Sequence, residues 1–326
     1  IEYHRPTKVI ATTHSGKMYR YESPRLDLMT TPEHNHFVRT RRTKQFRLVP
    51  ASECFGQMRI HLRTGEWTGK DLKGITIPGR VRREGRSNRQ QYRFSDPVTY
   101  DADDFLEFFG YWVTEGCLGN GGHIPVAQDR EVNPDTYDAI QSVLRRLGYE
   151  PCAQSKVLTI SDPRLHAWLK QFGKAKDKFL PREFLEASPR QLRILADAIF
   201  AGDGGVYYRE DHNCMRYELY TSSKQLADDY QELALKLGMS ANVRPQHRKD
   251  RSTVEYVVRW TLNDEVFTHH DARYGTKESW VDYDGPVHCV EVRNHVVYVR
   301  RNGVPVWSGN CIIPDGEMYR DEHGDV

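Results

Sequence analysis

The chain has 326 residues, of which 38% are hydrophobic and 11% aromatic, and its formal net charge is +2 at pH 7. This composition excludes an intrinsically disordered chain, because enough apolar surface is present to build cores, and the length fits two domains. There is no signal-peptide pattern and no apolar run of about 18 residues, which predicts an intracellular, cytoplasmic protein with no membrane partner. The six cysteines lack Cys-x-x-Cys spacing, so neither a zinc site nor a disulfide framework is expected.

Positive charge is concentrated in the first 100 residues, which hold 20 Lys and Arg against 9 Asp and Glu. The densest basic stretch interleaves its arginines with Gly, Asn, Gln and Tyr, and it consists of Arg80, Arg82, Arg83, Arg86, Arg89 and Arg93. Such a stretch can neutralise phosphates and release counterions, which predicts contact with DNA. A solvated, mobile linker explains the same composition equally well.

Residues 101–270 repeat one pattern twice. In each copy an apolar helical run ends in an acid followed by glycine, first at Glu115 and again at Asp203. The segments that follow predict a strand pair, a helix and a second strand pair, and the first copy closes with a further helix over 162–173. The repeat therefore predicts two halves of similar fold.

The two acid-ended helices align with an offset of 88 residues. The aligned pairs are Gly110 with Ala198, Thr114 with Gly202, and Glu115 with Asp203. Small residues at a spacing of four allow close helix packing, so a pseudo-two-fold axis along these helices would bring the two acids together. Two carboxylates at one place repel each other unless they are protonated or bridged by a divalent metal, and oxygen ligands suit Mg²⁺. This predicts metal-assisted phosphodiester hydrolysis, with strands that read bases in the major groove.

A glycine cap is the alternative explanation for the two acid–glycine pairs. It is disfavoured because an anion at the C-terminal end of a helix is unfavourable, and this arrangement occurs twice.

The stretch "YVRRNGVPVWSGNC" ends at Cys311. Its two strand-forming runs flank Asn302 and Gly303, which predicts a β-hairpin with both turn residues at positive φ. The hairpin is followed by Asn310 and Cys311. An asparagine can cyclise onto its own carbonyl carbon and cut the chain behind it, whereas most Asn-Cys pairs are an ordinary turn residue beside a small hydrophobic one.

"FFGYWVTEG" and "LADAIFAGDG" resemble the two signature motifs of a LAGLIDADG homing endonuclease in its single-chain form. The resemblance implies a duplicated αββαββα domain over residues 99–272 that cuts double-stranded DNA at a site in the host gene without the insert. It further implies that Glu115 and Asp203 are catalytic, metal-binding acids that use Mg²⁺. A basic residue often assists in this family, and Lys174, Lys176 and Lys178 are the candidates.

The flanking regions resemble an intein, in which a Hint splicing domain is interrupted by the endonuclease. "LDLMTTPEHNHFV" carries Thr31 and His34 of one splicing block, and "GPVHCVEVRNHVVYVRRNGVPVWSGNC" carries His295, Asn310 and Cys311 of the others. The implied fold class is α+β, with a β-rich Hint domain made of residues 1–98 and 273–310. Residues 311–326 would begin the C-extein of the host protein.

The resemblance implies a splicing chemistry that needs no metal or other cofactor. Cys311 accepts an acyl group as a thiolate, Asn310 cyclises to a succinimide, and His295 protonates the leaving amine or orients the asparagine. Gly309 stands where many members have His. Cys289 stands where Asp is usual, as a general participant or a buried thiol.

The family's first block, which begins with a nucleophile, is not found ahead of Thr31. We therefore expect a separate N-terminal intein fragment or an incomplete sequence.

Two alternatives stay open for the middle of the chain. The insert could bind DNA without cutting it, or the whole chain could be a DNA-binding regulator built on the same duplicated fold. Glu115 and Asp203 argue against the first, because loss of an acid is how decay of the nuclease would show. The flanking splicing motifs argue against the second, because a regulator has no need of them.

Overall fold

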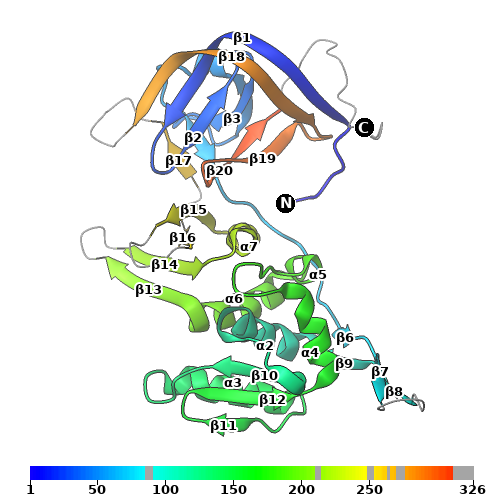
Figure 1. Cartoon of the computed structure of the whole chain (residues 1–326). Coiled ribbons are helices and arrows are strands. Elements are labelled where there is room, and N and C mark those ends of the chain that lie inside the picture. Colours follow the sequence, from blue (N-terminus) through cyan, green and yellow to red (C-terminus); the bar gives the residue numbers. More distant parts are fainter. Residues whose placement is uncertain (85–90, 210–213, 248–252, 263–264, 269–275, 311–326) are drawn as a thin grey trace. The chain divides into compact units, whose positions relative to one another are not determined.

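The computed structural model (Figure 1) describes the chain with several gaps. The described ranges are 1–84, 91–209, 214–247, 253–262, 265–268 and 276–310. No helix in these ranges is long and apolar enough to cross a membrane.

The chain divides into two compact units. The first comprises residues 1–66, 234–244 and 260 onward, and the second comprises residues 67–233 and 245–259. This division rests on internal contacts, so the functional boundaries predicted from the sequence stay predictions.

The first unit is built from β-strands. Its longest feature is an antiparallel pair of 15-residue strands, β1 (Lys8–Glu22) and β18 (Lys277–Glu291), and β2 (Asp27–Thr30) pairs with the end of β1. A second sheet has the order β17-β5-β3-β4, and one short helix follows β4 in the chain. These elements are β3 (Asn35–Arg39), β4 (Arg47–Pro50), α1 (Ala51–Cys54), β5 (Ile60–Leu62) and β17 (Glu265–Phe267). The core between these strands contains Tyr19, Tyr21, Leu26 and Val306, all nearly inaccessible to solvent.

The hairpin predicted around Asn302 is confirmed. Strands β19 (Val296–Arg301) and β20 (Val304–Gly309) pair along their whole length. Asn302 has φ 48° and Gly303 has φ 75°, as a two-residue turn that follows the twist of its strands requires. The Asn302 amide donates to Asp27 Oδ2 at 2.9 Å, so side-chain hydrogen bonding fixes the turn as well as backbone conformation.

Two long helices form the centre of the second unit, α2 (Ala102–Glu115) and α6 (Pro189–Asp203). Each starts at a residue that favours this position: Asp101 accepts backbone hydrogen bonds at the start of α2, and Ser188 does so at the start of α6. The elements after α2 are β10 (His123–Ala127), α3 (Pro134–Arg146), β11 (Cys152–Gln154), β12 (Val157–Ser161) and α4 (Pro163–Leu169). Those after α6 are β13 (Gly204–Arg209), β14 (Cys214–Thr221), α7 (Lys224–Lys236), β15 (Ser240–Gln246) and β16 (Glu255–Thr261).

The two sheets that follow these helices share one strand order. The later sheet has the order β13-β14-β16-β15, and the earlier one has β10-β12-β11, with an isolated bridge from Gly116 to Val126 beside β10. The bridge stands in place of the strand predicted directly after α2. Residues 116–122 contain four glycines and no β-branched residue, so this segment has little tendency to form a strand. The second strand pair predicted for this half is the hairpin of β11 and β12.

Shorter elements complete the second unit. They are β6 (Gly74–Ile77), β7 (Arg80–Glu84), β8 (Gln91–Ser95), β9 (Val98–Asp101), η1 (Asn120–Gly122), η2 (Lys170–Phe172) and α5 (Arg182–Leu185). Strand β6 pairs with β9, which leads directly into α2.

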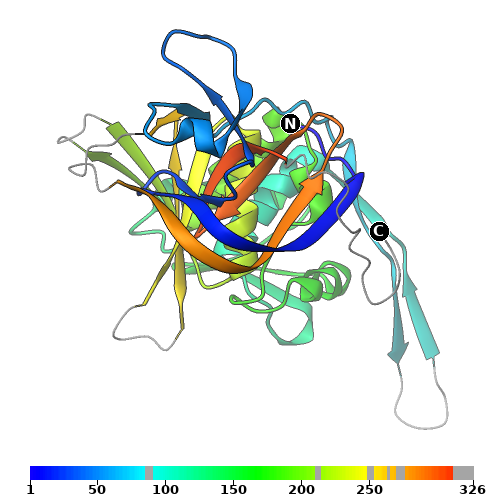
Figure 2. The same cartoon turned by 90° about the horizontal axis from the view of Figure 1, so that it is seen from above.

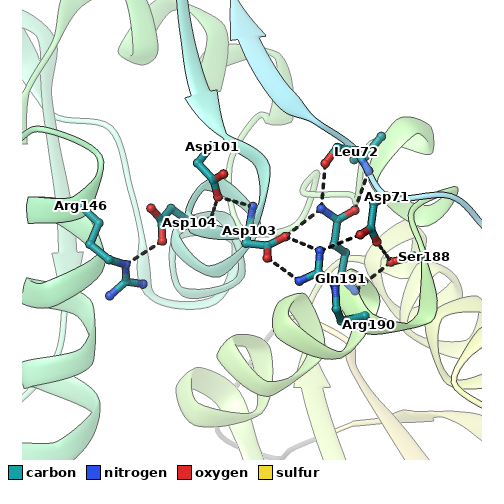
Figure 3. A network of polar contacts seen from close by, with 9 residues as sticks. All are labelled: Asp71, Leu72, Asp101, Asp103, Asp104, Arg146, Ser188, Arg190 and Gln191. Carbon is teal, nitrogen blue, oxygen red and sulfur yellow. Dashed lines mark hydrogen bonds and ion pairs between the residues drawn. The ribbon is translucent and has the colours of Figure 1, made fainter.

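A polar network joins the first turns of α2 and α6 (Figure 3). The Gln191 amide donates to Asp103 Oδ1 at 2.8 Å, and Arg190 forms an ion pair with the same carboxylate. Gln191 also accepts from the backbone N–H of Leu72 at 2.7 Å and donates to its carbonyl at 2.9 Å. Asp103 and Gln191 are again 88 residues apart, so the alignment of the two helices made from the sequence also describes their contact at this end.

Candidate functional site

Helices α2 and α6 approach each other at the small residues that align in the sequence. A Cβ atom added to Gly110 would lie 2.6 Å from Ala198 Cβ, and one added to Gly202 would lie 2.2 Å from Thr114 Oγ1. Both separations are too short for a real side chain, so each glycine is needed for the close approach. The pairs that touch are those aligned at an offset of 88, and the helices therefore run alongside each other in matching register.

Glu115 and Asp203 are the last residues of the two helices. The glycines after them, Gly116 and Gly204, have φ of −87° and −91°, so neither adopts the left-handed conformation of a helix-capping glycine. An added Cβ would lie 2.2 Å from Trp112 Cδ1 at Gly116, and 2.5 Å from the Phe200 carbonyl oxygen at Gly204. The glycines are thus required for space where the chain turns sharply away from its helix, which argues against the capping explanation.

The two carboxylates share one electrostatic environment. Glu115 is half-buried, and its pKa is raised first by burial and then by the charge of Asp203, while Lys178 opposes the shift. Burial and the charge of Glu255 raise the pKa of Asp203, again against Lys178, although the Asp203 side chain keeps an exposed surface. The Cγ atom of Glu115 would lie 3.4 Å from a Cβ placed on Gly202, the residue next to Asp203. The charge of Asp203 therefore acts on Glu115 at the helix ends.

Of the three candidate lysines Lys178 is buried, whereas Lys174 and Lys176 are exposed. The Lys178 Nζ donates to the carbonyl oxygens of Trp112 at 3.0 Å, Val113 at 3.0 Å and Gly116 at 2.7 Å. A cation at the carbonyl end of a helix is stabilising, and this one offsets an acid at the same end. One sequence signal could have found it, since Lys178 alone of the three is followed by two apolar residues.

Burial lowers the pKa of Lys178 to about 8, while the charges of Asp203, Cys117 and Glu115 oppose the shift. Near neutral pH the ammonium group is therefore still charged and lies within the field of both acids.

The side chains at these helix ends fit a magnesium ion. Glu115 and Asp203 supply carboxylate oxygens, and no group of three or more His, Cys, Asp or Glu able to hold a metal occurs among the described residues. Mg²⁺ characteristically keeps several waters and takes one or two carboxylates together with phosphate oxygens of a substrate, so two acids are sufficient. Glu115 and Asp203 would be its protein ligands.

The basic stretch lies on the hairpin of β7 and β8, which run side by side in Figure 2. In the register of this hairpin Arg82 lies opposite Arg93, and Arg80 lies opposite Ser95. Arg86 and Arg89 fall outside the described residues. The stretch therefore contains paired strands, unlike an irregular linker, and its contact with DNA stays a prediction.

In the first unit the structure brings together two segments predicted to act in splicing. The His34 Nε2 lies 2.9 Å from Ser308 Oγ, and the His34 N–H donates to the Thr31 carbonyl at 3.2 Å. A Cβ added to Gly309 would lie 2.5 Å from the Asn35 carbonyl oxygen. Gly309 therefore has no room for a side chain. Burial lowers the pKa of His34 to about 4, so its imidazole is neutral near pH 7.

Asn310 is packed against His295. Only 2% of Asn310 is exposed, its N–H donates to the His295 carbonyl at 3.1 Å, and its amide Nδ2 lies 3.5 Å from His295 Nδ1. His295 has φ 58°, a left-handed conformation that is uncommon outside glycine. Cys289 lies on β18 opposite Ile10. Cys311 falls outside the described residues.

Sequence analysis missed Ser308 and a cluster of three imidazoles. The ring centroids are 5.8 Å apart for His34 and His36, and 5.7 Å apart for His36 and His61. The His36 Nε2 lies 3.0 Å from Thr30 Oγ1. The spacing of two residues between His34 and His36 was the available signal, because it places both on one face of an extended segment. His61 and Ser308 are remote in sequence, and no local pattern indicates them.

Comparison with known proteins gives one family match. Residues 195–274, which begin in the second half of α6, match the family described as LAGLIDADG-like domain. This match covers the second of the two acid-ended motifs and the strands that follow it.

The chain is also similar to two curated proteins. One is the "DNA-directed RNA polymerase subunit beta C-terminal section" of Stigeoclonium helveticum, 24% identical over 363 residues that cover 94% of this chain and 33% of that protein. The other is the "ATP-dependent Clp protease proteolytic subunit" of Chlamydomonas moewusii, 24% identical over 258 residues that cover 75% of this chain and 25% of that protein. The chain thus spans about a third and a quarter of the lengths of these relatives.

Among solved structures, I-DmoI in complex with DNA and Mn aligns at 10% identity, over 49% of this chain and 90% of that one, with a TM-score of 0.35. The N-terminal LAGLIDADG domain of DUF199/WhiA aligns at 8% identity, over 48% of this chain and 75% of that one, with a TM-score of 0.32.

Proposed function

We propose that the second unit is a Mg²⁺-dependent endonuclease that cuts double-stranded DNA. The observation that carries this proposal is the packing of α2 against α6 at Gly110 and Gly202, which brings Glu115 and Asp203 into one electrostatic environment. The LAGLIDADG-like match over residues 195–274 supports it independently. The same packing favours two similar halves around a pseudo-two-fold axis, as in a duplicated endonuclease.

Each side chain has a separate task in this proposal. A divalent cation bound at the helix ends would act as a Lewis acid toward the phosphodiester and lower the pKa of a bound water. Glu115 and Asp203, once ionised above their raised pKa values, would supply the carboxylate oxygens that hold this ion. Lys178 fixes the last turn of α2 through three carbonyl groups, and so fixes the backbone that carries Glu115.

The test is a cutting assay on the host gene from which the whole intein-like coding sequence has been removed. The substrate is linear duplex DNA in which the two parts of the host gene are joined directly. We expect the purified chain to cut this duplex with Mg²⁺ and to leave it intact with EDTA. Binding without cutting at any Mg²⁺ or Mn²⁺ concentration would favour the DNA-binding-only alternative. No binding at all would contradict the proposal.

We also propose that the first unit is a protein-splicing domain of the intein type, with its Hint fold divided between the two ends of the chain. The observation in favour is the contact of the buried Asn310 amide with His295. The curated relatives add support, because they bear unrelated names and the chain spans a minority of each. A segment shared by otherwise unrelated proteins is expected when one element has been inserted into different host genes.

The arrangement suits asparagine cyclisation. The Asn310 Nδ2 attacks the Asn310 carbonyl carbon, so that a C–N bond forms to Nδ2 and the peptide bond to Cys311 breaks. The amide nitrogen loses one proton, and the freed amine of Cys311 gains one. His295 Nδ1, at 3.5 Å from Nδ2, is placed to orient the amide and to take its proton. The partners of this reaction would be the host extein protein and a peptide carrying the first splicing block with its leading Cys.

A further inference from the structure

The outer face of the β13-β14-β16-β15 sheet carries a cluster of polar side chains. Strand residues two apart share a face, so Arg216, Glu218 and Tyr220 lie on one face of β14. Leu219, on the opposite face, is fully buried. Across the strand pair, Tyr207 of β13 lies opposite Arg216 and is half exposed.

Glu218 is the anchor of this cluster. It is 7% exposed and accepts hydrogen bonds from Arg259 Nε at 2.7 Å and from the Tyr220 hydroxyl at 2.7 Å, and Arg216 Nε lies 3.4 Å from the same carboxylate. Burial works against ionisation, but these hydrogen bonds and the two guanidinium charges outweigh it and hold the pKa of Glu218 below its usual value. The group is therefore a buried anion that fixes both arginines.

Both arginines contact Glu218 through Nε, the inner nitrogen of the guanidinium group. Among the described residues no hydrogen bond engages the Nη groups of either one, and their side chains are 29% exposed for Arg216 and 38% for Arg259. β14 and β16 are the two central strands of the sheet. The outer pair of nitrogens on each arginine is thus held in a fixed orientation at the middle of the sheet.

We propose that Glu218 orients Arg216 and Arg259 to recognise guanine bases in the major groove, an assignment that rests on the DNA-binding function proposed above. Guanine presents O6 and N7 as two adjacent acceptors in the major groove, and a guanidinium group can donate to both. An arginine can also contact a DNA phosphate. Such a contact needs positive charge but no fixed orientation of the guanidinium group. Here the orientation is fixed and the carboxylate of Glu218 offsets part of the charge, so recognition of guanine is favoured over contact with phosphate.

The position of the recognised bases follows from β13, which starts directly after Asp203. Tyr207, which lies opposite Arg216 on β14, is four residues beyond Asp203 in the chain. Four residues of strand span about 13 Å. Successive bases of one DNA strand are about 3.4 Å apart, so the guanine preference should fall about four base pairs from the cut.

The experiment selects bound sequences from a pool of randomised duplex DNA, with the full chain in EDTA so that nothing is cut. For the wild type we expect guanine at two positions, preferred about tenfold to a hundredfold over other bases. Arg259→Lys and Arg216→Lys keep the positive charge but cannot bond both acceptors. Each should abolish one guanine preference while leaving the slope of log affinity against log salt unchanged. Arg145→Lys on α3, where the arginine forms an exposed ion pair with Glu150, is the control for the same change of residue type and should change nothing.

Two results would overturn this assignment alone: unchanged guanine preferences in both lysine variants, or a uniform loss of affinity across all sequences with a flatter salt slope. Glu218→Gln provides a check that does not alter either arginine, and it should weaken both guanine preferences together. If the wild type selects no duplex at all, the proposed DNA-binding function fails, and this assignment fails with it.

Discussion

The two candidate sites are built from different kinds of groups. In the first unit a buried, uncharged asparagine amide lies against His295, and Ser308 lies beside His34, whose pKa is lowered by burial. At the helix ends of the second unit the participants are two acids and a buried lysine. In the proposed functions, cleavage of the peptide bond after Asn310 requires positioned hydrogen-bonding groups and no metal ion, whereas cleavage of DNA, a polyanion, requires charged groups and a bound cation. The two sites should therefore respond to metal, pH and salt in different ways.

Metal chelation and Asn310→Ala should separate the two activities completely. EDTA should stop DNA cutting and leave release of the peptide after Asn310 unaffected, because that reaction involves only protein groups. Asn310→Ala should stop release and leave DNA cutting unaffected, and His295→Ala should slow release by about a hundredfold or more. Intact-mass spectrometry after long incubation measures the loss of residues 311–326. If EDTA stopped both activities, the claim that only the site in the second unit needs a metal ion would be wrong.

Lys178→Met should destabilise the second unit and shift its pH profile. Three helix-end carbonyls would lose their donor, at a cost of about 1–3 kcal/mol in the free energy of unfolding. Because Lys178 opposes the raised pKa values of Glu115 and Asp203, its removal should raise them further. Cutting should then fail at a higher pH, by up to about one pH unit. The exposed Lys174→Met is the control, and an identical pH profile in both variants would contradict the role given to Lys178.

Acid should destabilise the first unit through its buried imidazoles. The pKa of His61 is lowered to about 3 by burial and then by Arg59, and burial holds the pKa values of His36 and His34 below their usual value as well. A histidine whose folded-state pKa is lowered costs stability as pH falls below its unfolded value near 6.5. Between pH 7 and pH 4 His61 alone should cost about 3 kcal/mol. Chemical denaturation at several pH values measures this, and His61→Gln should flatten the dependence.

The smallest expected effect concerns the basic hairpin. Replacing Arg80, Arg82, Arg83 and Arg93 with Gln should reduce the slope of log DNA affinity against log salt, by about one for each of these arginines that binds a phosphate. The same replacement at Arg145 on α3 is the control. An unchanged slope would mean that the hairpin is a solvated extension with no part in DNA binding.

The parts of the structure that the sequence predicted depend on local signals or on internal repetition. The turn at Asn302 and Gly303 was predictable because both residues tolerate positive φ. The contacts of Gly110 with Ala198 and Thr114 with Gly202 were predictable because the two helices repeat the same spacing.

What the sequence could not predict depends on contacts between distant segments. The pattern around Lys178 hints at its burial, but the carbonyl groups that accept its hydrogen bonds lie more than 60 residues away in sequence. Ser308 meets His34 from the other end of the chain. In place of the strand expected after α2 there is only an isolated bridge. The glycine-rich residues 116–122 have little tendency to form a strand, although the repeat pattern predicts one there.

Glu115 and Asp203 must act as a pair if the second unit cuts DNA as proposed. The measurement is DNA cutting with Mg²⁺ by the wild type, Glu115→Gln and Asp203→Asn, with DNA binding followed in parallel. Because each variant removes one carboxylate charge, we expect either substitution alone to abolish cutting while affinity for DNA stays within a few-fold of the wild type. Cutting at a comparable rate by either variant would contradict the two-acid site.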